Sequence, residues 1–197
     1  RPNAMLPRIL PSPARRGDDL LATWSFVDAE NDPESGSRVQ WFLDGVEQPS
    51  LTGPTVPGLL DPSDPEAGPR TLKGQRWKFT VTPRDGFQWG PPVTSAELVI
   101  ANTPPSAFAL RIVPLSPDPA CLTLWSTACG LKAEWSYSDV DGDPQGVPEI
   151  RWYRDNAPQP FDGSTVVPAS ATRREERWHF TVAPSDGEDL GALLTSP

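Results

Sequence analysis

Acidic side chains gather in two short stretches of the sequence, where they stand at alternate positions. The members are Asp28, Glu30, Asp32 and Glu34 in the first stretch, and Asp139, Asp141 and Asp143 in the second. Ca²⁺ takes roughly six to eight oxygen ligands, and a loop that curls around the ion can supply several carboxylates at this spacing. We therefore predict Ca²⁺ as the candidate cofactor, with Asp139, Asp141 and Asp143 as the better ligand set and Asp28 with Asp32 as its counterpart.

A solvated turn is the alternative for both stretches, because Asp side chains also accept hydrogen bonds from nearby backbone amides. Asp85 and Asp186 each precede a glycine and are expected to approach the same end of the fold as these loops. The sequence leaves both interpretations open.

Catalytic chemistry has little support in the residue pattern. His179 is the single histidine, and it stands between Trp178 and Phe180 in a strand-like stretch, so it should point outward. No Ser or Cys nucleophile can be matched to it, and no glycine-rich phosphate loop is present. The paired carboxylates lack the flanking pattern of a glycosidase. We predict that the chain is not an enzyme and has no catalytic residues.

Two tryptophans, Trp89 and Trp125, have no counterpart elsewhere in the chain and stand in or beside loops. An exposed indole can stack on a sugar or on a protein surface, although it can equally cover the edge of a domain. Residues 49–70 and 117–130 are the loops that would carry such a binding site. A glycan is therefore a candidate ligand.

The two cysteines, Cys121 and Cys129, lie eight positions apart within one loop. We predict a local disulfide between them, which implies an oxidising compartment. The alternative is two free thiols. Two cysteines without a second pair or a nearby histidine make a poor zinc site.

The chain is an internal repeat, and this organises everything else. Residues 77–90 return as 178–191, at an offset of 101 positions. Upstream, Trp24 and Trp41 return as Trp135 and Trp152, at an offset of 111 positions. We therefore predict two domains, 1–103 and 104–197.

Short runs of alternating apolar and polar residues, separated by turn signals, predict strands in both copies. Residues 76–82 alternate most clearly, and the 26 prolines and 15 glycines of the chain exclude long helices. The aromatic residues that recur at fixed strand positions are the expected core. They are Trp24, Trp41, Trp77 and Phe79 in the first copy, and Trp135, Trp152, Trp178 and Phe180 in the second. The expected fold class is all-β, with two tandem immunoglobulin-like antiparallel β-sandwiches.

Three motifs carry a family resemblance: D-V-D-G-D at 139–143, W-Y-R-D at 152–155, and the run from Trp178 to Gly187. They resemble tandem Ig-like, PKD-like or cadherin-like repeats of large bacterial surface and secreted proteins, and the likeness covers nearly the whole chain twice. Ala22 and Phe79 stand where disulfide-bearing relatives carry paired cysteines, as do Ala133 and Phe180. The resemblance implies an extracellular or cell-surface location, with neighbouring Ig-like domains or identical subunits as partners.

The second copy is expected to lack its closing strand. The first copy continues through residues 96–101, whereas the same offset brings the second copy to Pro197. We expect the sheet edge beside 177–183 to be unpaired, or filled by a strand supplied in cis or by a neighbouring subunit. The start at Arg1 fits a mature or excised part of a longer protein.

Composition narrows the function classes further. The net charge of −9 disfavours nucleic acid, whose phosphates require a basic face. No apolar run reaches the roughly 20 residues that a membrane span needs. We expect a non-catalytic structural repeat unit of an extracellular surface protein or filament, with strand complementation as its candidate mode of assembly. The alternatives are a glycan- or protein-binding adhesin module and the accessory domains of a secreted enzyme.

Overall fold

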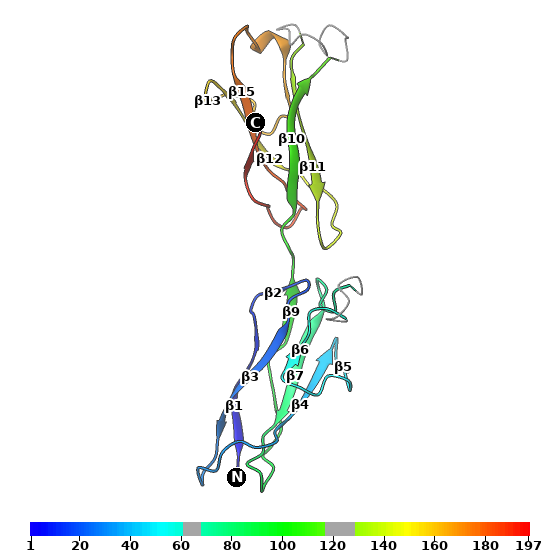
Figure 1. The fold of residues 1–197 in the computed structure, drawn as a ribbon, viewed down its shortest axis with the longest axis vertical. Coiled ribbons are helices and arrows are strands. Elements are labelled where there is room, and N and C mark those ends of the chain that lie inside the picture. The colour runs from blue at the N-terminus through cyan, green and yellow to red at the C-terminus, as the bar shows by residue number, and fades with distance from the viewer. Residues whose placement is uncertain (61–67, 117–128) are drawn as a thin grey trace. The chain divides into compact units, whose positions relative to one another are not determined.

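The computed structural model describes residues 1–60, 68–116 and 129–197. The chain divides into two compact units, Arg1–Thr103 (unit 1) and Pro104–Pro197 (unit 2), which are described separately (Figure 1). Strands dominate both units, and the helical turn η2 (Ala169–Ala171) is a short 3₁₀ element. Within the described residues, no helix has the length and apolar character needed to cross a membrane.

Unit 1 is a sandwich of two sheets. The smaller sheet has the order β1–β3–β6, and the larger has the order β2–β9–β7–β4–β5, with β8 also paired to β7. The smaller sheet comprises β1 (Asn3–Leu10), β3 (Leu20–Val27) and β6 (Thr55–Val56). The larger comprises β2 (Ala14–Arg15), β4 (Arg38–Leu43), β5 (Val46–Glu47), β7 (Arg76–Thr82), β8 (Val93–Thr94) and β9 (Leu98–Ala101).

Among the described residues, unit 2 repeats this arrangement with fewer strands, in the orders β10–β11–β14 and β13–β12–β15–β16. Its first sheet comprises β10 (Ser106–Pro114), β11 (Leu131–Ser138) and β14 (Val166–Val167). Its second comprises β12 (Glu149–Arg154), β13 (Ala157–Pro158), β15 (Trp178–Ala183) and β16 (Leu194–Thr195). Within the residues that the structure describes, unit 2 has no strand equivalent to β9.

The predicted fold class is confirmed, since each unit is an Ig-like β-sandwich built almost wholly from antiparallel pairs. The short pair β2–β9 is parallel and departs from that rule. Residues 49–70, expected to be a loop throughout, contain the strand β6, which pairs with β3. A two-residue strand is difficult to recognise from sequence in a stretch so rich in proline and glycine.

Alternation along β7 shows why these residues form a sandwich. Trp77, Phe79 and Val81 are buried while the intervening side chains are partly exposed. Because side chains of a strand point alternately to its two faces, this pattern directs one face into the core. All eight predicted core aromatics either lie in the two buried clusters or pack directly against them.

The two units also share the backbone conformation of their hairpin turns. Asp44 and Gly45 take φ values of 48° and 81°, and Asp155 and Asn156 take 49° and 66°, so both hairpins close in the left-handed region. A Cβ atom at Gly90 would overlap the carbonyl oxygen of Pro2, and one at Gly191 would overlap that of Pro105. This close backbone approach explains why the repeated segment keeps glycine there.

The edge of unit 2 differs in part from the expectation. Thr181 and Val182 pair with Thr195 and Leu194 of β16, so the edge is not unpaired over its whole length. The expectation was wrong for the second half of β15. Residues 191–196 correspond to residues 90–95 of unit 1, and that segment contains the short strand β8, which pairs with β7. The other half of the edge, at the start of β15, has no partner beyond β12 among the described residues.

Candidate functional site

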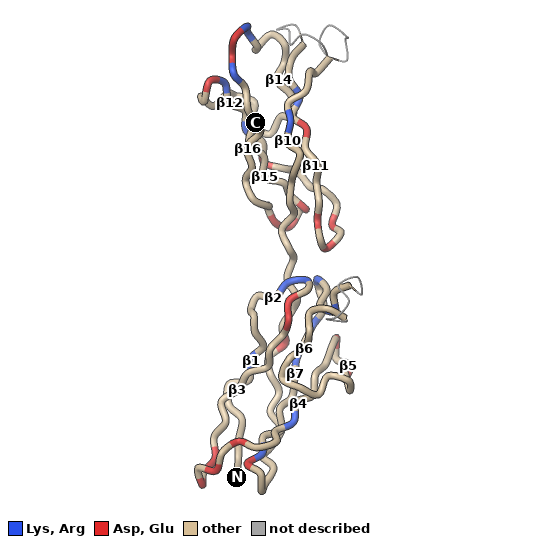
Figure 2. Tube along the Cα trace, viewed as in Figure 1, with Lys and Arg blue, Asp and Glu red and all other residues tan. Residues whose placement is uncertain are grey.

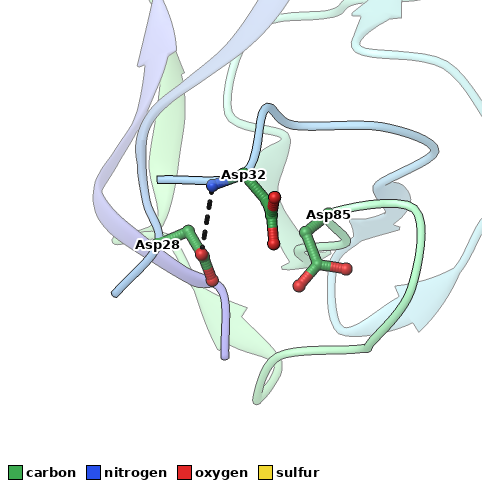
Figure 3. Close-up of side chains that lie close together, drawn as sticks. All are labelled: Asp28, Asp32 and Asp85. Carbon is green, nitrogen blue, oxygen red and sulfur yellow. Dashed lines mark hydrogen bonds between the residues drawn. The ribbon is translucent and has the colours of Figure 1, made fainter. Parts of the chain in front are cut away.

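Three carboxylates meet at one end of unit 1. Asp28 follows β3, Asp32 lies in the same loop, and Asp85 comes from the turn after β7. Each offers one oxygen, and these oxygens all lie within 4.8 Å of one another (Figure 3). Two loops far apart in the sequence therefore bring three negative charges to one place, which favours a hard cation.

Backbone amides fix one oxygen of two of these carboxylates. Asp28 Oδ1 accepts hydrogen bonds from the amides of Glu30 at 2.9 Å and Asp32 at 3.3 Å. Asp85 Oδ1 accepts from the amides of Phe87 at 2.7 Å and Gln88 at 2.6 Å. Turn capping and cation binding are thus compatible, since capping occupies only one oxygen of each carboxylate.

The side chain of Asp28 is almost fully enclosed. Its side chain is 1% exposed, and its Oδ2 lies 3.3 Å from the amino terminus of Arg1. The same ammonium group donates a hydrogen bond to Glu30 Oε2 at 2.7 Å.

The pKa of the Asp28 carboxyl reflects these neighbours. Burial alone would raise this pKa, but the amides of Glu30 and Asp32 and the Arg1 ammonium outweigh it, so the pKa lies below its ordinary value. In return, the hydrogen bond to Glu30 raises the pKa of the Arg1 amine despite the opposing effect of desolvation. Asp28 is thus held in the anionic form that a cation requires.

Unit 2 contains the same arrangement, formed by Asp139, Asp143 and Asp186. Asp139 Oδ1 accepts from the amides of Asp141 at 2.8 Å and Asp143 at 3.2 Å. Asp186 Oδ1 accepts from the amides of Glu188 and Asp189, both at 2.7 Å. The acidic segment after β11 appears red in Figure 2.

The Oδ2 atom of Asp139 is buried and accepts no hydrogen bond. A buried anionic oxygen without a partner is costly, and a bound cation would remove that cost. Its counterpart in unit 1, Asp28 Oδ2, is likewise buried without a hydrogen bond and lies 3.3 Å from the amino terminus of Arg1.

The carboxylate cluster differs from the predicted ligand set at one position in each unit. Asp141, a predicted ligand, does not belong to the cluster that contains Asp139 and Asp143, and Asp186 completes that cluster instead. In unit 1 Asp85 joins the predicted Asp28 and Asp32. The repeated Asp-Gly pair at offset 101 contains this third carboxylate, but the predicted ligands were chosen by their alternate spacing within one loop.

Glu34, the last acidic residue of the first stretch, lies outside the cluster. Its Oε1 accepts hydrogen bonds from Trp24 Nε1 at 2.9 Å and from Ser37 Oγ at 2.5 Å. It therefore supports the loop and the core indole rather than a cation.

Trp89 lies beside a hollow of about 600 Å³ in unit 1. The guanidinium carbons of Arg38 and Arg84 are 4.6 and 5.0 Å from its ring centre. Polar side chains line the hollow with it, among them Arg38, Gln40, Glu47, Gln48 and Thr52. The hollow thus combines an indole with amide and carboxylate groups. Trp125, the second predicted binding residue, lies outside the described residues.

His179 stacks on Tyr153, with ring centroids 4.8 Å apart and planes at 3°. The two rings face each other across the pair β12–β15, in which these residues are in register. The imidazole thus packs on an aromatic neighbour in the sheet.

Cys129 is buried next to β11, and no free cysteine is found among the described residues. Cys121 lies outside them. The pairing of Cys121 with Cys129 therefore stays a prediction.

No family model and no curated protein matches this chain. Among solved structures, the crystal structure of the FN1–FN3 domains of chicken CNTN1 is similar, at 15% sequence identity and a TM-score of 0.34. The match covers 100% of this chain and 66% of that one, so the chain spans about two thirds of the fragment. The assignment of an Ig-like sandwich rests on the sheets themselves.

Proposed function

We propose that this chain is a non-catalytic structural repeat unit of an extracellular bacterial surface protein or filament. The observation that carries the proposal is that the two units share one framework. The shared features include the core aromatics and a serine side chain that bonds to the backbone of β7 or β15. Ser95 Oγ accepts from the amide of Phe79 at 3.1 Å, and Ser196 Oγ accepts from that of Phe180 at 3.0 Å. Duplication of a whole framework suits a segment whose function is to extend a surface protein.

Location is tested on cells. An antibody raised against residues 1–197 should label intact cells of the producing organism, and mild external protease should remove the signal. Labelling that appears only after permeabilisation would overturn the extracellular assignment.

Mechanical function is tested on the purified chain held between two handles in a force experiment. Each unit has roughly 100 residues, so each unfolding event should release about 300 Å of contour length at ~3.3–3.6 Å per residue. Two separate events are expected because each unit has its own core. A single event that releases the whole chain would contradict independent repeats.

We also propose that Ca²⁺ binds the two acidic clusters. The support is the convergence of three carboxylates in each unit and the burial of Asp28 and of Asp139 Oδ2. A bound ion would connect the loop after β3 or β11 to the turn after β7 or β15 and would stiffen that end of the unit. Water and backbone carbonyls would complete the coordination.

Glycan binding is the second candidate function, and the hollow beside Trp89 favours it. The test is a glycan array probed with the intact chain and with Trp89→Ala, using Phe87→Ala as the control because Phe87 is 82% exposed in the same turn. Binding that is lost only in Trp89→Ala would support this function. Binding unchanged in both variants would remove Trp89 from it.

A further inference from the structure

The hollow beside Trp89 in unit 1 has the size of a ligand pocket. Its volume of about 600 Å³ lies within the range of roughly 300–1,000 Å³ that small-molecule sites occupy. Its walls come from β4, from residues 47–52 and from the turn after β7. Segments that are distant in the sequence therefore build one concave surface.

Backbone hydrogen bonds hold two of these walls in place. The amide of Gln48 donates to the Trp41 carbonyl oxygen at 2.8 Å, which fixes the segment after β5 against β4. The amide of Gly90 donates to the Pro83 carbonyl oxygen, also at 2.8 Å, and closes the turn that carries Trp89. Because the walls are already ordered, a ligand would lose little affinity to the ordering of the protein.

The two arginines over the Trp89 ring have different surroundings. Arg84 is partly buried, and its Nη2 donates to the Gly86 carbonyl oxygen at 3.2 Å. Arg38 is exposed, lines the hollow and makes no ion pair in the described part of the chain. Cation–π attraction holds the Arg38 guanidinium on the indole and leaves its N–H donors unused. These donors are available to an anionic group in the hollow.

A carboxylate is the anionic group that suits Arg38. The planar guanidinium presents parallel N–H donors, and the two oxygens of a carboxylate match that spacing. Trp89 restricts the guanidinium to one place, so less side-chain freedom is lost when the pair forms.

The opposite charge of the hollow belongs to Glu47. Among the described lining residues, Arg38 and Glu47 are the charged ones. Glu47 Oε1 accepts a hydrogen bond from Gln40 Nε2 at 3.0 Å, and the carboxylate retains acceptor sites for hydroxyl groups. Gln48 and Thr52 add an amide and a hydroxyl. Since Glu47 would repel a second anionic group, the matching ligand is rich in hydroxyl groups and carries one negative charge.

Unit 2 keeps the framework around the hollow but not its polar groups. The registers of β4 with β7 and of β12 with β15 are equivalent, and so are the turns that follow β7 and β15. At the positions of Arg38, Gln40, Glu47 and Trp89, unit 2 carries Glu149, Arg151, Pro158 and Leu190. The sandwich fold therefore does not require the side chains of the hollow, as expected for a binding site added to a common framework.

We propose that the hollow binds a saccharide that carries one carboxylate, such as a uronic acid residue of a glycan. The Arg38 guanidinium pairs with the carboxylate, and Trp89 is a positioning residue that holds this guanidinium in place. Glu47, Gln48 and Thr52 bind the sugar hydroxyl groups. This inference rests on the glycan-binding function proposed above and adds the charge class of the glycan.

The experiment titrates the intact chain with pairs of short oligosaccharides and follows its amide and indole N–H signals by NMR. In each pair, one member ends in glucuronic, galacturonic or mannuronic acid and the other ends in the neutral parent hexose. In at least one pair, the acidic member should bind roughly twofold to fivefold more tightly, as expected for an exposed ion pair. This difference should shrink at high ionic strength.

Equal binding within every pair would overturn the proposal. Tighter binding of the tripeptide Gly-Glu-Gly than of every acidic saccharide would also overturn it, because the hollow would then recognise an acidic peptide.

Substitutions test the assigned roles. Arg38→Gln should remove the preference for the acidic member and leave binding of the neutral member unchanged. Arg8→Gln is the matched control, because Arg8 is an exposed arginine of β1 in the other sheet of unit 1. Trp89→Leu introduces the residue that unit 2 carries at this turn position, and it should weaken the same preference. An undiminished preference in Arg38→Gln, or an equal loss in Arg8→Gln, would contradict the role of Arg38.

The two proposals can fail separately. Saccharides that bind equally well with and without a carboxylate would overturn the charge class and leave glycan binding in place. Failure of every saccharide in the pairs and on the glycan array to bind would overturn both.

Discussion

Trp41 and Trp77 meet edge to face in the core of unit 1, with ring centroids 6.3 Å apart and planes at 77°. Trp152 and Trp178 repeat this contact in unit 2, at 6.3 Å and 73°. The indole nitrogen of Trp41 donates to the Gly53 carbonyl oxygen at 2.9 Å, which satisfies its polar group inside the core. These contacts make Trp41 of β4 and Trp152 of β12 central packing residues of the two sandwiches.

Replacing that tryptophan should destabilise unit 1 strongly. Trp41→Ala removes a fully buried indole and leaves the Gly53 carbonyl oxygen without its donor, so we expect a loss of about 3–5 kcal/mol in the free energy of unfolding. The measurement is denaturant unfolding followed by circular dichroism. Phe87→Ala, at an exposed ring, should change stability by less than about 0.5 kcal/mol. Equal losses in both variants would contradict the assigned core.

The core strands were predictable from the sequence because they depend on local periodicity. The two-copy organisation was predictable because the same residues recur at a fixed offset. Trp77 and Phe79 alternate with polar residues, and the same letters return as Trp178 and Phe180. The pair Asp44-Gly45 likewise predicted a turn, since glycine tolerates the left-handed backbone that the hairpin needs.

Long-range placement was harder to predict. Asp85 was expected at the same end of the fold as Asp28, but its place in the carboxylate cluster depends on how β7 and β3 are stacked. The two-residue pair β15–β16 was also missed, because two residues carry no periodic signal. The hollow beside Trp89 depends on side chains from several strands and is visible only in the folded unit.

Calcium should stabilise the chain if the acidic clusters bind it. At a free Ca²⁺ concentration 100 times the dissociation constant, linkage gives about 2.7 kcal/mol for one site. We expect a higher melting temperature with Ca²⁺ than with chelator, measured by differential scanning calorimetry.

Asp186→Asn should abolish the calcium effect in unit 2, because it removes one charge from the cluster. Asp162→Asn, an exposed carboxylate outside the cluster, should leave the effect intact and serves as the control. Identical melting of the unmodified chain in Ca²⁺ and in chelator would exclude a site that matters for stability.

Acid should weaken unit 2 partly through Glu134. Hydrogen bonds from Arg111, and then from Lys132, lower the pKa of Glu134 below its ordinary value of 4.5. The unfolded chain therefore takes up this proton first as the pH falls, so the contribution to stability is complete above about pH 4.5 and is lost as the pH falls through the folded-state pKa.

In Glu134→Gln this part of the acid dependence should disappear, as measured by urea midpoints between pH 6 and pH 3. Glu149→Gln, which removes an exposed carboxyl group from β12, is the comparison. Equal acid dependence in Glu134→Gln and the unmodified chain would contradict a role for the Arg111 contact.

The predicted disulfide should contribute modestly to stability. Cys121 and Cys129 would close a small loop, so the expected loss in Cys121→Ser with Cys129→Ser is about 2–3 kcal/mol at most. A thiol assay on the denatured, unreduced chain should find no free thiol. Two thiols per chain would reject the bond.

The central claim is that β9 covers the first half of the edge of β7 in unit 1, whereas no strand among the described residues covers that half of β15 in unit 2. Amide hydrogen exchange of the isolated chain, followed by NMR, tests it most directly. The amides of Trp77 and Phe79 should both be protected, and so should that of Phe180, which is bonded to Ser196 Oγ at 3.0 Å. The Trp178 amide should exchange faster than that of Phe180 by a factor on the order of 100. Equal protection of Trp178 and Phe180 would contradict the account.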